Sequence, residues 1–307
     1  MTHLPCRHLA QRMASTAIGW LHRHREHGAF PPGTSAELAD PNGVYKPLGE
    51  SALAACLLLR TPASTPADRR LADSLLSFAW AQLGHGTLLY ERQLRYPAMT
   101  DPLEVYAHFA RAGYRHDALH ELEQYLTGLA SHRGSEHLPN RRLAVANAAH
   151  VAGLPVHAHW PTLTAATWLG HTPEPWTIDW MTGYAVTHTV FHITDWGAEP
   201  HNLPPALSEY LATWLPVWTD IWAEIHEWDL VAELLIAGLC LPDPVGDTDA
   251  WQRLAEVQRP DGLMPPDSRP VPDDPHEAFT TGHHTTVVAA IAATLALAHH
   301  QQQPVAS

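Results

Sequence analysis

The sequence has little cysteine, little positive charge and no long apolar run, and each shortage excludes a class of protein. Its three cysteines, Cys6, Cys56 and Cys240, are far apart in 307 residues, which argues against a disulfide framework or a cysteine-based zinc site. Lys and Arg total 18 against 32 Asp and Glu, a formal charge of −14. This charge argues against nucleic acid or an anionic membrane surface as a partner.

Targeting and membrane signals are also lacking. The N-terminus has no apolar core of the kind found in signal peptides. The most apolar stretch, residues 285–298, is shorter than the roughly 18 residues that a membrane helix needs. We therefore expect a cytoplasmic protein.

What the chain does contain favours one helical domain spanning residues 1–307. Hydrophobic residues make up 45% of it and include 12 Trp, which is enough to fill a large core. Strand-like alternation is nearly absent, and the segments between prolines and glycines have helical periodicity. We expect twelve helices, at residues 7–27, 49–60, 67–83, 101–112, 115–130, 140–152, 160–169, 176–196, 205–224, 226–241, 248–258 and 281–299. The Pro-rich stretch 259–280 is interpreted as a loop that covers one face, either packed or acting as a lid.

The helices alternate in character along the chain. Segments 48–59, 231–241 and 285–298 are apolar nearly all round, whereas 67–83 and 115–130 are amphipathic. Alternating buried and half-buried helices predict an inner ring wrapped by an outer one, an α/α toroid with about six helices in each layer. The N-termini of the inner helices would meet at one mouth of this ring, where polar ligands are favoured.

Two sets of residues resemble known toroid proteins. Gln258, Asp261 and Gly262 resemble the Q-x-x-D-G turn of the terpenoid-cyclase and protein-prenyltransferase toroids, although the aromatic residue that usually follows the glycine is missing. Segments 46–50, 184–197 and 226–235 are similar to an uncharacterised bacterial toroid-like family. The resemblance implies the fold and no particular reaction.

One helix carries a candidate metal site. His188, His192 and Asp195 lie at i, i+4 and i+7 within the predicted helix 176–196, so their side chains share one face. Two of them, with His283 or His284 from another inner helix, would hold a divalent metal ion, and Asp195 would be a ligand or would orient an imidazole. Imidazoles with a carboxylate suit Fe²⁺, Zn²⁺ or Cu²⁺. The alternative is that both histidines are hydrogen-bonded core residues and that Asp195 caps the following turn.

Carboxylates form a second candidate site. They are Asp101 with Glu104, and Glu227, Asp229 and Glu233, which could face one another across the ring mouth and act as acid and base. Glu50 and Asp229, near predicted helix starts, would be polar neighbours of the metal ion, one of them serving as general base. The alternative is that Asp101 caps its helix. A third acidic group, residues 273–277, superficially resembles a magnesium-diphosphate motif, but the prolines around it predict a non-helical surface loop.

These patterns support three functional hypotheses. The first is a metal-dependent enzyme that modifies a small molecule or a modified peptide by oxidative or Lewis-acid chemistry. The second is a metal-free, carboxylate-based carbohydrate-active or cyclase-like enzyme, and the third is a non-catalytic protein that binds a ligand at a Trp-rich mouth. The sequence specifies neither the substrate nor an oligomeric state.

Overall fold

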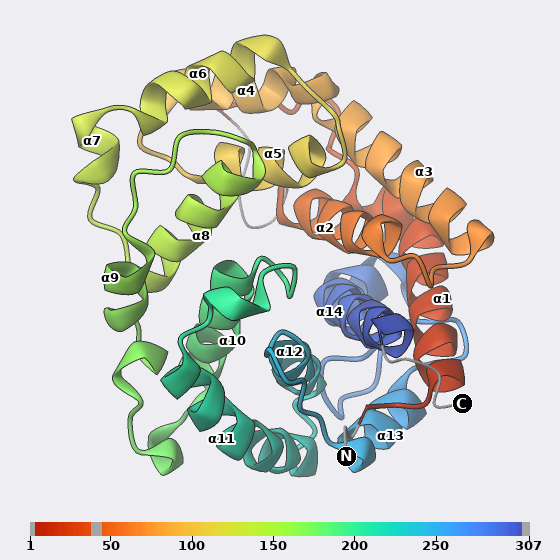
Figure 1. Cartoon of the computed structure of the whole chain (residues 1–307). Coiled ribbons are helices and arrows are strands. Elements are labelled where there is room, and N and C mark those ends of the chain that lie inside the picture. Colours follow the sequence, from red (N-terminus) through yellow and green to blue (C-terminus); the bar gives the residue numbers. More distant parts are fainter. Residues whose placement is uncertain (1–3, 38–44, 303–307) are drawn as a thin grey trace.

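The computed structural model describes residues 4–37 and 45–302, and within these ranges the chain is helical with no β-strand (Figure 1). The predicted all-α class is therefore confirmed. The described α-helices are α1 (Arg7–His24), α2 (Lys46–Arg60), α3 (Pro66–Gln82), α4 (Thr87–Arg95), α5 (Asp101–Arg111), α6 (Asp117–Thr127), α7 (Ala130–Arg133), α8 (Pro139–Val151), α9 (Trp160–Ala165), α10 (Trp180–Thr194), α11 (Pro205–Glu224), α12 (Trp228–Leu239), α13 (Thr248–Val257) and α14 (Pro275–Gln302).

Six of these helices contact one another in a closed cycle. The order of contacts is α2, α5, α8, α10, α12, α14 and back to α2, while α3, α11 and α1 pack from outside against α2, α12 and α14 (Figure 1). Such a cycle is what an inner ring with an outer layer requires. Membership of a known toroid class stays a prediction.

Burial explains why the sequence alternates between two kinds of helix. In α12 every residue from Trp228 to Leu239 is buried, because neighbouring helices cover it on all sides. The outer helix α13 instead buries only Ala250, Trp251, Leu254 and Ala255, which form one stripe along a 3.6-residue period. Apolar composition all round a helix thus corresponds to a place in the contact cycle.

The Pro-rich segment is shorter than predicted. Helix α14 begins at Pro275, and the Oδ1 atom of Asp274 accepts hydrogen bonds from the backbone N–H groups of His276 and Glu277, both at 3.0 Å. The prediction that prolines keep residues 273–277 out of a helix is therefore wrong for its second half. Proline is compatible with the first helical turn because its missing N–H would have no partner there.

The Q-x-x-D-G turn has a packing role. The Gln258 amide donates to the carbonyl oxygens of Met13 (3.2 Å) and Gly262 (3.3 Å), which ties the end of α13 to α1. Gly262 has φ +102°, and a Cβ atom there would lie 2.0 Å from the carbonyl oxygen of Thr16. Only glycine permits this close approach of two backbones.

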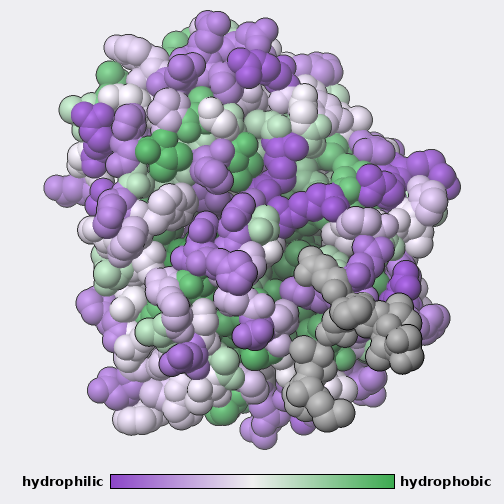
Figure 2. Space-filling model, viewed as in Figure 1, coloured by the Kyte–Doolittle hydropathy of each residue, from purple (hydrophilic) through white to green (hydrophobic). Residues whose placement is uncertain are grey.

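Helix α14 is long and apolar enough, by length and composition, to cross a membrane, but 83% of its most apolar window is buried inside the protein. Such burial is typical of a core helix. On the face viewed in Figure 2, hydrophilic residues dominate and hydrophobic residues form small separate patches. These observations are compatible with a soluble protein.

Candidate functional site

A cavity of about 640 Å³ lies inside the cycle of six helices. All six helices contribute to its wall, and several of the contributing residues belong to the first turns of their helices, where unpaired backbone N–H groups favour negative charge. The polar lining residues are Lys46, Glu50, Glu104, Asn140, Arg141, Tyr184, His188, His192, Asp229, Glu233 and His284.

His284 lies at the centre of the polar side of this cavity. Its Nδ1 atom is 2.7 Å from Oε1 of Glu50, and its Nε2 atom is 3.6 Å from both Oδ2 of Asp229 and Oε1 of Glu233. Burial lowers the pKa of His284, but the surrounding carboxylates outweigh burial and raise this pKa well above its ordinary value. One imidazole therefore meets three carboxylates.

Hydroxyl groups hold two of these carboxylates in place. Asp229 accepts hydrogen bonds from Tyr184 Oη at 2.5 Å and from Thr285 Oγ1 at 3.0 Å. Glu233, with only 1% of its surface exposed, accepts one from Thr187 Oγ1 at 2.5 Å. Because these donors come from α10 and α14, packing of the ring fixes where the carboxylate oxygens point.

Glu50 and Lys46 complete the group. The Nζ atom of Lys46 lies 3.6 Å from Oε1 of Glu50, one turn away on α2. Burial alone would raise the pKa of Glu50, but the hydrogen-bonded His284, the nearby His283 and Lys46 lower it well below its ordinary value. Glu50 is therefore ionised and can accept the proton of His284 Nδ1 in a hydrogen bond.

Asp229 and Glu233 differ in their acidity. Burial raises the pKa of Asp229, and the nearby Glu233 carboxylate adds to this increase. Burial also acts to raise the pKa of Glu233, but His188 and His284 lie close to it and lower the pKa to about 2. The environment therefore favours a charged Glu233 beside an Asp229 that holds its proton more readily.

Asp229, Glu233 and His284 have the geometry of a metal site. Each offers one ligand atom, and these atoms lie within 4.8 Å of one another. Metal–ligand bonds of about 2.0–2.2 Å would require only a small closing movement of the three side chains. Glu50 on the Nδ1 side of the imidazole matches the usual outer partner of a metal-binding histidine.

Comparison with known proteins assigns the chain to a family. A family model described as "Domain of unknown function (DUF6895)" matches residues 14–294. The chain belongs to the DUF6895 family. The matched range runs from α1 into α14, so the whole His284 cluster lies within the DUF6895 domain. No curated protein and no solved structure matches the chain.

The two histidines predicted on α10 of this DUF6895 domain both line the cavity. Nε2 of His188 lies 3.6 Å from Oε2 of Glu233, and its ring centroid is 6.1 Å from that of His192. Burial and the nearby His188 lower the pKa of His192 to about 3, so its imidazole is neutral. His188 is therefore beside the Asp229–Glu233–His284 group, and His192 lies one turn further along α10.

Asp195 lies apart from this group. It follows the last residue of α10 and has a left-handed backbone (φ 46°), because the helix ends at Thr194 and not at 196 as predicted. Its carboxylate makes a two-point ion pair with Arg111 (2.7 and 2.5 Å) and lies 3.6 Å from Arg60. The predicted helical i, i+7 relation of Asp195 to His188 does not hold, because α10 of the DUF6895 domain ends at Thr194.

Two further predicted residues have other partners. Asp101 accepts a 2.5 Å hydrogen bond from Arg92 and does not line the cavity. His283 is buried with Nε2 3.0 Å from Ser51 Oγ, and its Nδ1 lies 3.6 Å from Oε2 of Glu50. Of the His283–His284 pair, only His284 lines the central cavity of the DUF6895 domain.

Sequence reasoning gave no role to the hydroxyl donors. Tyr184, Thr187 and His188 lie at i, i+3 and i+4 on α10, a spacing that puts them on one helix face. Asp229 and Glu233 have the same i, i+4 relation on α12. Helices α10 and α12 are otherwise mainly apolar, so one polar face on each was the signal in the sequence that these two faces contact each other.

Proposed function

We propose that this chain is a metal-dependent enzyme that binds one divalent transition-metal ion through Asp229, Glu233 and His284 and acts on a small molecule in the central cavity. The observation that carries this proposal is the orientation of His284. Its Nδ1 faces the Glu50 carboxylate at 2.7 Å, so its Nε2 faces two further carboxylates that are themselves held by hydroxyl groups. An ion would take the place of the proton on Nε2 and offset the excess of negative charge.

The ligand set restricts the ion. Two carboxylates with one imidazole are ligands that suit Mn²⁺, Fe²⁺ or Zn²⁺. Cu²⁺ has the highest intrinsic affinity of the divalent series, but the ligand types do not single it out. The open cavity beside the three ligands leaves room for water or substrate. Bound there, the ion would act as a Lewis acid or supply an activated water. His188, with 44% of its side chain exposed and 3.6 Å from Glu233, is placed to exchange a proton with substrate.

The cavity wall suggests the kind of substrate. Apolar and aromatic side chains face the cavity from α10 and α14, and the charged groups of Lys46 and Arg141 also line it. A wall with an apolar side and a side rich in polar and charged groups suits a small organic molecule or one modified peptide side chain that has both kinds of surface. We place the enzyme in the cytoplasm, since Cys6, Cys56 and Cys240 are all free thiols.

Metal analysis tests the proposal directly. Protein purified without a His-tag should contain about one transition-metal ion per chain, and Glu233→Gln should weaken the affinity for added Zn²⁺ or Mn²⁺ by about 10- to 100-fold. Glu224→Gln, on the exposed surface of α11, is the matched control and should bind like the parent. A parent protein that neither retains nor binds any of these ions in titration calorimetry would contradict the proposal.

The opposite pKa displacements of Asp229 and Glu233 support a second candidate, a metal-free acid–base enzyme in the same cavity. Carbohydrate-active or cyclase-like reactions belong to this class. The two candidates differ in one measurement. Exhaustive chelation would abolish turnover by the metalloenzyme and leave turnover by the metal-free enzyme unchanged.

A further inference from the structure

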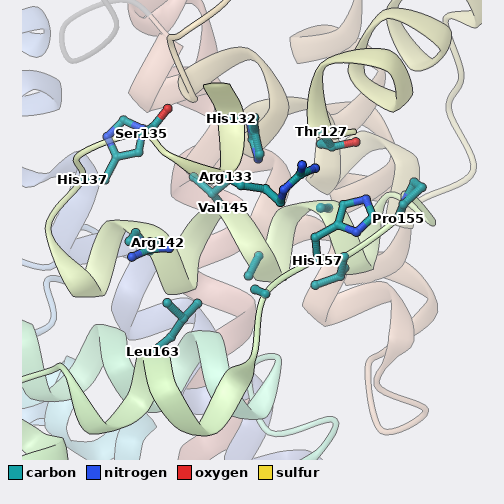
Figure 3. Close-up of a pocket in the computed structure, with 14 residues that line it drawn as sticks. Thr127, His132, Arg133, Ser135, His137, Arg142, Val145, Pro155, His157 and Leu163 are labelled. Atoms are coloured by element: carbon teal, nitrogen blue, oxygen red, sulfur yellow. The ribbon is translucent and has the colours of Figure 1, made fainter. Parts of the chain in front are cut away.

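A second pocket lies outside the central cavity, between α7, α8, α9 and residues 155–158 (Figure 3). Its volume is about 110 Å³. All of its charged or chargeable lining residues are basic: His132, Arg133, His137, Arg142 and His157. The whole chain has a formal charge of −14, whereas this pocket wall contains no Asp or Glu, so its charge is opposite in sign to that of the chain.

The two arginines of this pocket lack carboxylate partners. Within residues 4–37 and 45–302, neither Arg133 nor Arg142 forms an ion pair, whereas Arg141, which lines the central cavity, pairs with Glu104 at 2.6 Å. Arg133 makes one hydrogen bond, from Nη1 to the carbonyl oxygen of Gly128 at 2.8 Å. Its remaining N–H groups are available, and Figure 3 shows its guanidinium group extending into the pocket between His132 and His157.

Like charges crowd this pocket. Burial lowers the pKa of His132, and the nearby His137, His157 and Arg133 lower it further. Positive groups that repel one another at short range lose that repulsion when an anion lies among them. A guanidinium group with free N–H donors is the side chain best suited to a planar oxyanion, because it can bind two oxygens at once.

Apart from Thr127 and Ser135, the rest of the pocket is apolar. Val145, Ala146 and Ala149 from α8 and Leu163 from α9 form one wall, with Pro155 and Val156 beside them. A free inorganic ion would leave this wall uncovered. A ligand with an oxyanion at one end and a compact apolar body would use both parts of the pocket.

We propose that this pocket binds a small organic oxyanion, a carboxylate or a phosphate ester with a compact apolar body. Arg133 binds the oxyanion, Arg142 supplies further positive charge, and α8 and α9 cover the apolar body. The site shares no lining residue with the central cavity, so it does not depend on the metal proposed there.

Titration calorimetry of the full chain tests this site with benzoate, inorganic phosphate and benzyl alcohol as probes. Benzoate should bind, and benzyl alcohol, which has the same ring without the charge, should bind at least about tenfold more weakly. Arg133→Gln should weaken benzoate binding by about tenfold or more, and Arg142→Gln by several-fold, because each removes a charge-assisted contact. Arg70→Gln, on the exposed surface of α3, is the matched control and should change nothing.

Two further measurements keep the outcomes distinct. Arg133 also donates a hydrogen bond to the Gly128 carbonyl oxygen, so its replacement could destabilise the fold. The melting temperature of Arg133→Gln is therefore compared with that of the parent. If this variant melts at a lower temperature, the test rests on Arg142→Gln. Benzoate affinity should be the same in Glu233→Gln, which separates this pocket from the metal site. Binding of phosphate that both arginine variants weaken also supports an oxyanion site. Absence of binding by both anions, or benzoate binding that neither arginine variant weakens, overturns the proposal.

Discussion

Helix α10 contacts one ionisable cluster in its N-terminal half and another at its C-terminal end, and the two are neutralised differently. At the C-terminal end, Asp195 faces the permanent charges of Arg111 and Arg60. In the cavity, the buried Asp229 and Glu233 share the imidazole of His284, which can lose its proton. A carboxylate paired with guanidinium groups stabilises the fold, whereas carboxylates around an exchangeable imidazole can accept a different cation.

The largest expected effect concerns the ion pairs of Asp195 with Arg111 and Arg60, which in this comparison stabilise the fold. Asp195→Asn should lower the free energy of unfolding by about 3–5 kcal/mol, because it leaves the largely buried Arg111 without its ion-pair partner. Urea denaturation of parent and variant at neutral pH measures the change. Metal affinity should be unaffected. If the Asp195→Asn variant lost metal binding while keeping the stability of the parent, Asp195 would belong to the ligand set after all.

A further carboxylate, that of Glu123 on α6, sharpens the comparison because it is buried with neither a guanidinium nor an imidazole partner among the described residues. It is 2% exposed, its Oε1 has no hydrogen-bond partner, and burial together with the nearby Asp101 raises its pKa to about 8. Between the ordinary pKa of 4.5 and pH 8, the unfolded chain releases a proton that the folded chain keeps. The free energy of unfolding therefore falls as the pH rises through this window.

Glu123→Gln should remove this pH dependence. At pH 8 the variant should be more stable than the parent by roughly 2–4 kcal/mol, and at pH 4.5 the two should be nearly equal. Urea denaturation at both pH values checks it, with Glu121→Gln on the exposed face of α6 as the control. Parallel pH profiles for the parent and the Glu123→Gln variant would show that Glu123 is ionised in the folded state.

The smallest effect concerns the cavity. Asp229→Asn should raise the free energy of unfolding at neutral pH by about 1 kcal/mol, since it removes one of several crowded carboxylates whose burial is unfavourable. The same variant should lose metal affinity. Chelator-treated protein is used for the stability measurement, and the exposed Asp73→Asn on α3 serves as control. A loss of stability as large as that expected for Asp195→Asn would mean that both clusters are structural.

The sequence predicted the helices best where composition and periodicity agree. All-round apolar segments correspond to α2, α12 and α14, because each is covered on several sides by other helices. Helix α4, at Thr87–Arg95, was not predicted, since its nine residues are too few to show a clear period. The start of α14 was placed late because proline was interpreted as excluding a helix.

The site was predicted in part for the same reason. Glu50, Asp229 and His284 were selected because they lie near the starts of apolar helices, and the structure places them together. Asp195 was selected by spacing along one helix, which cannot reveal that the helix ends one residue earlier. The tertiary partners Arg111 and Arg60 come from other helices, and a single sequence does not show which arginine meets which carboxylate.

The position of α14 also determines when the site can form during synthesis. This helix carries His284 and packs against α1, α2 and α12, which span residues 7–60 and 228–239. Until it is made, the apolar faces of α1 and α12 lack their principal cover and Glu50 lacks its imidazole partner. A ribosome-bound chain that ends before residue 275 should therefore be a substrate for chaperones and have no metal affinity at this site.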